Sequence, residues 1–171
     1  RSWRRNAEGN SYPAYSALKE RFRYDFELFQ QAVQDEQLGP IVVDQCELTY
    51  VDHILEEGTK NFQDVAQVFS CWSWPKPSQT LQPENASFKT SFRLVDDENK
   101  PVARLTVTCG RGIRLSDCKQ VLVLTTIARG RPSKTNVAGV LEFLDLLQKP
   151  AVDLFVAITH SRMHTLWGKK S

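Results

Sequence analysis

The sequence lacks any apolar run approaching the roughly 18 residues that a membrane-spanning helix requires, and no signal peptide is visible. A membrane protein is therefore not expected. Cysteine is scarce, because the chain has four widely and irregularly spaced residues without a C-x-x-C pair. We expect reduced, mostly buried thiols rather than a disulfide framework, and a cytoplasmic location. The four are Cys46, Cys71, Cys109 and Cys118.

An excess of charge of one sign is also missing. The 22 basic and 20 acidic residues leave a net charge of +2, too little by itself to indicate nucleic acid or an anionic membrane as the partner. The hydrophobic share of 41% in 171 residues predicts a single domain over residues 1–171 with a core of its own. Methionine is limited to Met163 and the chain opens on Arg1, so we expect that the true N-terminus lies outside it.

The stretch from Asn136 to Trp167 carries apolar residues at helical intervals. The stripe keeps its phase across Pro150, which predicts one long helix bent at that residue. Asn136 is expected to be its N-cap. A stripe of this length requires a sheet or other helices to cover it. Its members are Val140, Leu144, Leu147, Ala151, Leu154, Ile158 and Met163, widened by Val137, Leu141 and Phe155.

The rest of the chain predicts a second amphipathic helix and several strands. The helix begins near Pro13 and ends at Leu38-Gly39-Pro40. Its apolar stripe is Tyr15, Leu18, Phe22, Phe26, Phe29 and Val33. A short helix is expected over Asn61 to Phe69, and strands over Ile41 to Val51, Phe88 to Val95, Val102 to Arg114 and Val121 to Arg129.

These elements predict an α+β fold, with a mainly antiparallel sheet of about four strands packed against the long C-terminal helix and the N-terminal helix. The run Val121 to Leu124 is apolar on both faces, which places its strand centrally. A helix-grip form, in which the sheet curls round the last helix, leaves a gap that suits a small apolar ligand.

Several blocks in order span nearly the whole chain. They read W-R-R followed by Y-P-A-Y-S-A-L-K-E-R-F, then Q-C-E-L-T-Y-V-D-H-I, then L-T-T-I-A-R-G, and finally L-D-L-L-Q-K-P-A-V-D-L-F-V-A-I-T-H-S-R-M-H-T-L-W-G. Together they resemble an uncharacterised, sporadically distributed bacterial family of about 250 residues, this chain matching its C-terminal two thirds.

The resemblance implies that a strand-rich part precedes Arg1 in longer relatives, and it implies no activity. Asp52 stands where relatives tend to carry asparagine. Leu147-Gln148 replaces a small residue followed by a polar one. No site is therefore inferred at these positions.

His160 and His164 are the candidate metal ligands. If the helix continues to Trp167, residues four apart project both imidazoles from one face, which is half of a zinc site. No acidic side chain on the same turn supplies a third ligand, so the alternative is a pair of polar residues near a helix C-terminus. A metal-dependent enzyme stays open as a hypothesis.

Two arginine clusters are candidate ligand-binding sites, since guanidinium groups suit phosphate or carboxylate and the glycines let a ligand approach the main chain. A hairpin that turns near Ser116 places Arg129 opposite roughly Arg104, so the clusters lie towards opposite ends of the strand pair. Solvated cations at strand ends are the alternative. The clusters are Arg111 with Arg114, and Arg129 with Arg131.

Trp72 and Trp74 lie in a proline-rich connection, where they either stack on bases or lock the segment against the core. Glu47 and Asp52 are interpreted as exposed strand carboxylates. Ser161 beside His160 does not form a dyad, because adjacent helical residues do not face each other, and there is no G-x-S-x-G motif.

No convergent catalytic set emerges, so no catalytic residue and no cofactor are assigned and a non-enzymatic protein is favoured. The leading hypothesis is an interaction or small-ligand-binding module in the bacterial cytoplasm, with self-association through a sheet edge or a helix left open. The alternatives are nucleic-acid binding through the arginines and loop tryptophans, and the metal-dependent enzyme.

Overall fold

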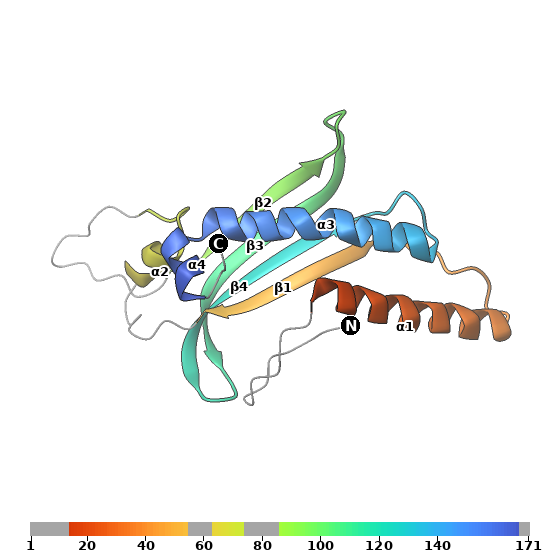
Figure 1. Ribbon diagram of the computed structural model, residues 1–171, viewed down its shortest axis with the longest axis horizontal. Helices are drawn as coiled ribbons and strands as arrows, with labels where there is room; N and C mark the ends of the chain where they lie inside the picture. The colour runs from red at the N-terminus through yellow and green to blue at the C-terminus, as the bar shows by residue number, and fades with distance from the viewer. Residues whose placement is uncertain (1–13, 55–62, 74–85, 168–171) are drawn as a thin grey trace. The chain divides into compact units, whose positions relative to one another are not determined.

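The computed structural model describes residues 14–54, 63–73 and 86–167, and the chain divides into two compact units (Figure 1). The first unit comprises Arg1–Cys46 and Arg131–Asp145, and the second comprises Glu47–Gly130 and Leu146–Ser171. The interpretation of residues 1–171 as a single domain stays a prediction.

The first unit contains helix α1 (Tyr15–Asp35) and the opening turns of helix α3 (Val137–Ile158). The amphipathic helix predicted near Pro13 is confirmed, but none of its residues is fully buried. Phe29, which was expected to face inward, is 56% exposed. Tyr24 and Leu28 are exposed to a similar extent. The Lys19 ammonium holds the Asp145 carboxylate at 2.9 Å.

Helix α3 begins where the sequence predicts. The Oδ1 of Asn136 accepts a hydrogen bond of 2.9 Å from the Gly139 N–H and so caps the first turn. The helix continues through Pro150, as expected from the unbroken apolar stripe. Its buried residues include most of that stripe, together with Phe143, which the periodicity did not select.

The prediction that this helix reaches Trp167 is wrong, because α3 ends at Ile158 and a separate helix, α4, spans Ser161–Leu166. The cause is a β-bridge between Thr159 and Phe69. The Ser70 N–H donates to the Ile158 carbonyl at 2.8 Å, and the His160 N–H donates to the Val68 carbonyl at 2.9 Å. These bonds pull the backbone out of the helical conformation.

The second unit is built on one open antiparallel sheet. Its strands are β1 (Cys46–Ile54), β2 (Phe88–Val95), β3 (Pro101–Arg114) and β4 (Lys119–Gly130), in the order β1-β4-β3-β2. The apolar strand β4 is internal, as predicted. The first strand was predicted to begin at Ile41, but it begins at Cys46 and Val42 is 67% exposed.

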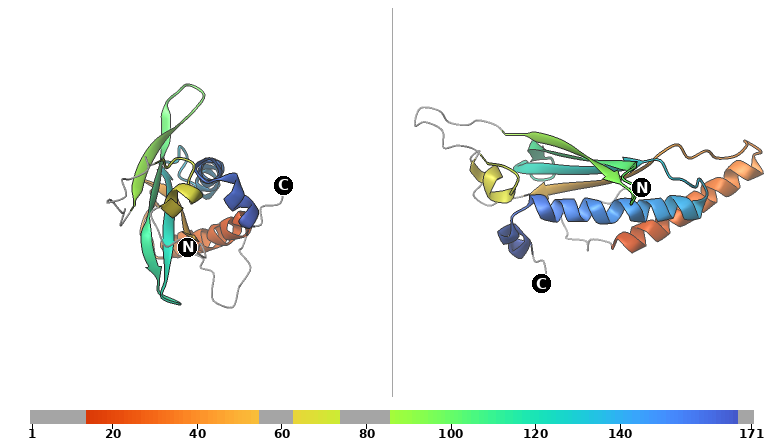
Figure 2. Two further views of the ribbon diagram at one scale, coloured as in Figure 1. Left: turned by 90° about the vertical axis from the view of Figure 1, so that its left-hand side faces the viewer. Right: turned by 90° about the horizontal axis from the view of Figure 1, so that it is seen from above.

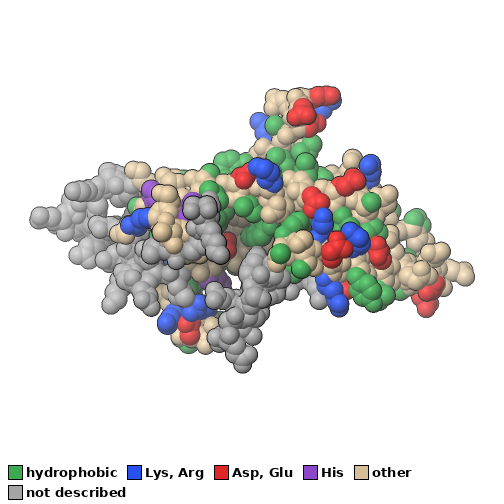
Figure 3. Space-filling view, viewed as in Figure 1, with side chains coloured by type: hydrophobic (Ala, Val, Ile, Leu, Met, Phe, Trp, Pro, Cys, Tyr) green, Lys and Arg blue, Asp and Glu red, His purple; other side chains and the backbone are tan. Residues whose placement is uncertain are grey.

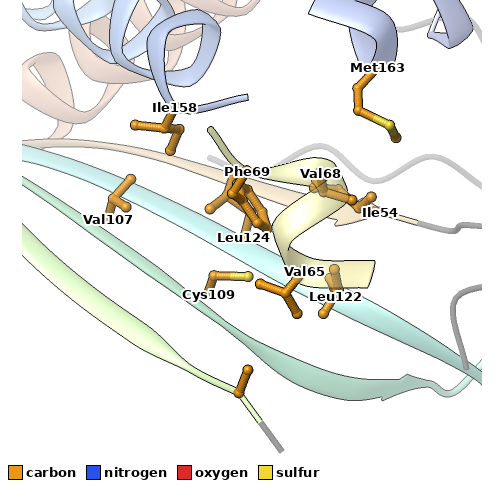
Figure 4. Close-up of a cluster of buried hydrophobic side chains, with 11 residues drawn as sticks. Ile54, Val65, Val68, Phe69, Val107, Cys109, Leu122, Leu124, Ile158 and Met163 are labelled. Atoms are coloured by element: carbon orange, nitrogen blue, oxygen red, sulfur yellow. The ribbon is translucent and has the colours of Figure 1, made fainter. Parts of the chain in front are cut away.

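One face of this sheet carries the core of the second unit. Helix α2 (Gln63–Val68), helix α4 and the C-terminal part of α3 lie on that side, which we call the inner face (Figure 2, left). Figure 4 shows Val107, Leu122 and Leu124 of the strands pointing towards residues of these helices. The cluster comprises Ile54, Val65, Val68, Phe69, Ala86, Val107, Cys109, Leu122, Leu124, Ile158 and Met163.

The opposite side is the outer face. Strand β2 forms one edge of the sheet, and six of its eight residues are exposed. Figure 3, which views the molecule from the side of α3, shows acidic and basic side chains on the turn that joins β2 to β3. Phe92 is one apolar side chain of this edge that is 42% exposed. In the part of the chain that the structure describes, no helix has the length and apolar character of a membrane span.

Candidate interaction site on the outer face of the sheet

Three arginines form a row across neighbouring strands. Arg93 of β2 lies opposite Arg104 of β3, and Arg104 lies opposite Arg129 of β4. Directly opposed side chains on one sheet face have Cβ atoms about 5 Å apart, and like charges that lie directly opposite each other are destabilising. An anionic partner would relieve this repulsion.

One end of the arginine row is partly neutralised. Arg129 pairs with Glu47 of β1, its Nε donating to Oε2 at 2.7 Å. Two hydrogen bonds lower the pKa of the Glu47 carboxyl group. The larger effect comes from Arg129 and the smaller one from the Thr49 hydroxyl. Arg93 and Arg104 have no ion-pair partner among residues 14–54, 63–73 and 86–167. The two uncompensated cations therefore lie at the β2 side of the row.

The surroundings of the row are polar and cationic. Lys89 lies on the same face of β2 as Arg93, opposite Thr108. The Ser91 and Thr106 hydroxyls are 3.0 Å apart between them. By strand alternation, the four strands direct no phenylalanine, tyrosine or tryptophan to the outer face. This face therefore offers cations, hydroxyl groups and the aliphatic side chain of Ile127, which lies opposite Thr106, but no phenylalanine, tyrosine or tryptophan on which bases could stack.

The register confirms that the two predicted arginine clusters are apart. Arg111 lies opposite Leu122, whose side chain is in the core on the inner face, and Arg111 itself is exposed. Arg114 is held by Asp117, with Nε and Nη2 donating at 2.9 Å and 2.5 Å. This pair lowers the pKa of Asp117 to about 2 and raises the pKa of Arg114. Arg114 is thus occupied within its own hairpin.

The remaining predicted ligand-binding residues lie elsewhere. Arg131 belongs to the first unit, where it is 3.7 Å from Asp44. Trp72 packs against the core cluster, its ring centroid 6.0 Å from that of Phe88, which agrees with the alternative that the tryptophan locks its segment. Trp74 lies outside the described residues. The structure therefore does not bring Trp72 to the arginine row.

His160 and His164 do not share a helix face, because His160 has an extended backbone as the N-cap of α4. His164 lies in the last turn, with Nε2 2.7 Å from the Thr159 hydroxyl. That hydroxyl donates its proton to the Phe155 carbonyl at 2.6 Å, so Nε2 is the donor towards Thr159. Within the described ranges, no cluster of three or more His, Cys, Asp or Glu side chains is arranged to hold a metal ion.

Two expectations about acids and thiols need correction. Asp52 is not an exposed carboxylate, because it lies on the inner-face register of β1 between Tyr50 and Ile54 and is half-buried. Burial raises its pKa, and nearby His53 lowers it by a smaller amount. The thiols are all free but only half of them are buried, since Cys71 and Cys118 are exposed.

Arg93 is the functional candidate that the sequence reasoning missed. The alternation of β2 already placed its side chain away from the core, and the β3–β4 register already paired Arg104 with Arg129. What was absent was the β2–β3 register, which adds the third arginine.

The chain matches no protein-family profile, no curated protein and no solved structure, so the resemblance to a bacterial family stays a prediction.

Proposed function

We propose that this protein is a non-enzymatic interaction module of the bacterial cytoplasm that binds an extended, acidic segment of a partner protein along strand β2. The observation that carries the proposal is the uncompensated pair Arg93–Arg104 beside a sheet edge. The cytoplasmic location is supported by the four cysteines, all of which are free thiols.

The edge of the sheet supports a strand as the binding mode. Within the described residues β2 pairs with β3 alone, so the backbone groups on its other side are available to a further strand. An added strand gains main-chain hydrogen bonds from the edge and specificity from its alternating side chains. The two faces of β2 would then be read by alternate residues of the ligand.

The pattern of β2 specifies the chemistry of that ligand. On the outer face Lys89 and Arg93 are four residues apart, with Ser91 between them. On the inner face Phe92 is partly exposed. Because a neighbouring strand lies about 5 Å away, the fitting segment has acidic residues at positions i and i+4, a small polar residue at i+2, and apolar residues at i+1 and i+3.

The same cations suit phosphate, so nucleic acid is the second candidate. Two features favour the acidic segment. Within the four strands the outer face has no phenylalanine, tyrosine or tryptophan for base stacking, and the Glu47 carboxylate closes one end of the arginine row. A strand ligand also uses the open edge of β2, which a nucleic-acid ligand leaves unused.

Peptide titration followed by fluorescence anisotropy tests the proposal. A labelled Glu-Val-Thr-Val-Glu peptide is expected to bind, and the same peptide with lysine in place of glutamate is not. The double variant Arg93→Glu/Arg104→Glu should weaken binding at least about threefold, because the exposed charge pair between Arg93 and one glutamate of the peptide, worth roughly 0.7 kcal/mol, is lost and negative charges take its place. Arg111→Glu is the matched control, since Arg111 is an exposed arginine of β3 on the other face.

Three outcomes contradict the proposal. The first is equal affinity for both peptides, or affinity for neither. The second is binding of single-stranded RNA that falls steeply with salt while the acidic peptide does not bind, which assigns the face to nucleic acid. The third is a stable dimer that Arg93→Glu/Arg104→Glu dissociates, which assigns the edge to a second copy of the chain.

A further inference from the structure

A small pocket lies between the inner face of the sheet and helix α3, within the second unit. Its volume is about 120 Å³. The β1 residues Tyr50 and Asp52 and the β4 residue Thr126 line it on the sheet side, and Ala151, Val152 and Phe155 line it on the helix side. A cavity of about 150 Å³ holds benzene, so this pocket suits a ligand of about four to six non-hydrogen atoms.

Thr126 is an unusual residue for this place. It is 1% exposed, on the inner face of the internal strand β4. Its Oγ1 has no hydrogen-bond partner in the part of the chain that the structure describes. A buried hydroxyl normally has a partner, and this one belongs to a residue that lines a pocket. A polar atom of a ligand is the partner that would complete it.

Asp52 adds a carboxyl group to the same pocket. Burial raises the pKa of its carboxyl group, so ionisation is disfavoured until a cation arrives. No cationic side chain of the described elements forms an ion pair with Asp52. His53, its neighbour on β1, is exposed on the outer-face register, and Lys149 of α3 is exposed and paired with Asp153. The inner-face neighbours of Thr126 on β4, Leu124 and Ala128, are apolar.

We propose that this pocket binds a small primary alkylammonium ion, with the ammonium group between the Asp52 carboxylate and the Thr126 hydroxyl and the alkyl stem against Ala151 and Phe155. The ammonium group has three donors and no acceptor, which matches two acceptor groups in a cleft. The aromatic rings of Tyr50 and Phe155 favour a cation in addition. This binding is independent of the outer face used by the proposed partner.

The test is a titration of the full ¹⁵N-labelled chain with n-butylammonium, n-butanol or n-butyrate, followed by two-dimensional NMR. We expect saturable chemical-shift changes at Tyr50, Thr126 and Ala151. n-Butylammonium should bind at least about tenfold more tightly than n-butanol, because only the ammonium ion forms an ion pair with Asp52. Asp52→Asn should reduce this preference to less than about twofold. Glu47→Gln, on the same strand but the outer face, should leave it unchanged.

The unmodified protein provides a second readout, which keeps the test decisive if Asp52→Asn unfolds. As the pH falls through the pKa of Asp52, the carboxylate is neutralised and the preference for n-butylammonium over n-butanol should vanish. Equal binding of the two ligands near neutral pH, absence of saturable shifts, or a preference that persists in Asp52→Asn would overturn the proposal.

Discussion

The two faces of the sheet come from the same strands, yet they have opposite characters. On β4 the inner-face residue Leu124 is fully buried, whereas its neighbour Thr125 on the outer face is only half-buried. The helices that the structure describes in the second unit lie on the inner side of the sheet (Figure 2). On β3 the inner-face residue Leu105 is buried, whereas the neighbouring Arg104 is exposed. A shift of one residue thus separates the core of the second unit from the surface where we place its partner.

Truncation of a side chain to alanine should give the largest difference in unfolding free energy between the two faces. Leu124→Ala should lower the free energy of unfolding by about 3 kcal/mol, because it removes buried methyl groups and leaves a cavity. Thr125→Ala, one residue along the strand, should change it by about 0.5 kcal/mol. Denaturant unfolding of both variants measures the difference. Similar losses in the two variants would break the distinction between the faces.

The next effect concerns the one carboxylate found on the inner-face side of β1. Because burial raises the pKa of Asp52, its stabilising contribution is fully present below the ordinary value of 3.8 and is lost as the pH rises through the raised value. Asp52→Asn should therefore unfold at a higher temperature than the parent at pH 7, and at the same temperature below pH 3.8. Thermal unfolding across this range is the measurement. A parent that is more stable than the variant at pH 7 would contradict the expected sign.

A smaller effect is expected in the arginine row, where a substitution should stabilise the fold. Arg104→Glu converts a row of three like charges into an alternating one, so it should raise the free energy of unfolding by about 0.5 kcal/mol at low salt. The gain should fade at about 1 M salt, where exposed charges are screened. Arg104→Gln is a useful control, because it removes the repulsion without adding an attraction and should give an intermediate value.

The smallest effect is expected where an arginine already has its partner. Arg114 lowers the pKa of Asp117 to about 2, so the pair stabilises the fold above pH 3.8 and this contribution is lost as the pH falls towards 2. Asp117→Asn should lower the unfolding temperature slightly at pH 7 and leave it unchanged near pH 2. Asp97→Asn, in the exposed turn between β2 and β3, is the matched control for the loss of one negative charge.

The fold followed from periodicity, with errors where the chain makes contacts distant in sequence. Alternation along β2 separated Phe88, Phe92 and Leu94 from Lys89, Ser91 and Arg93, and the register with β3 places these two sets on opposite faces of the sheet. The helical stripe carried α3 through Pro150, but it also suggested a continuous helix to Trp167. The break at Thr159 depends on a bridge to Phe69, ninety residues away in the chain. A local pattern cannot contain that information.

The candidate site was recoverable only in part for the same reason. The sequence predicted that Arg104 and Arg129 lie opposite each other, because a tight turn near Ser116 fixes the register of the hairpin. The position of Arg93 in that row depended on the β2–β3 register, which includes a shift between Leu94 and Val95. The environment of Asp52 was misjudged, because one acidic residue in an alternating strand does not reveal what covers its face.

By itself the sequence determined where most of the helices and strands lie and which side of most of them is apolar, because these properties depend on neighbours a few positions apart. Tertiary structure alone decided that three arginines stand in one row, that His160 leaves the helix, and that Asp52 and Thr126 share a pocket. Each of those facts rests on strand pairing or helix packing between distant segments, where small differences in register move a side chain from core to solvent.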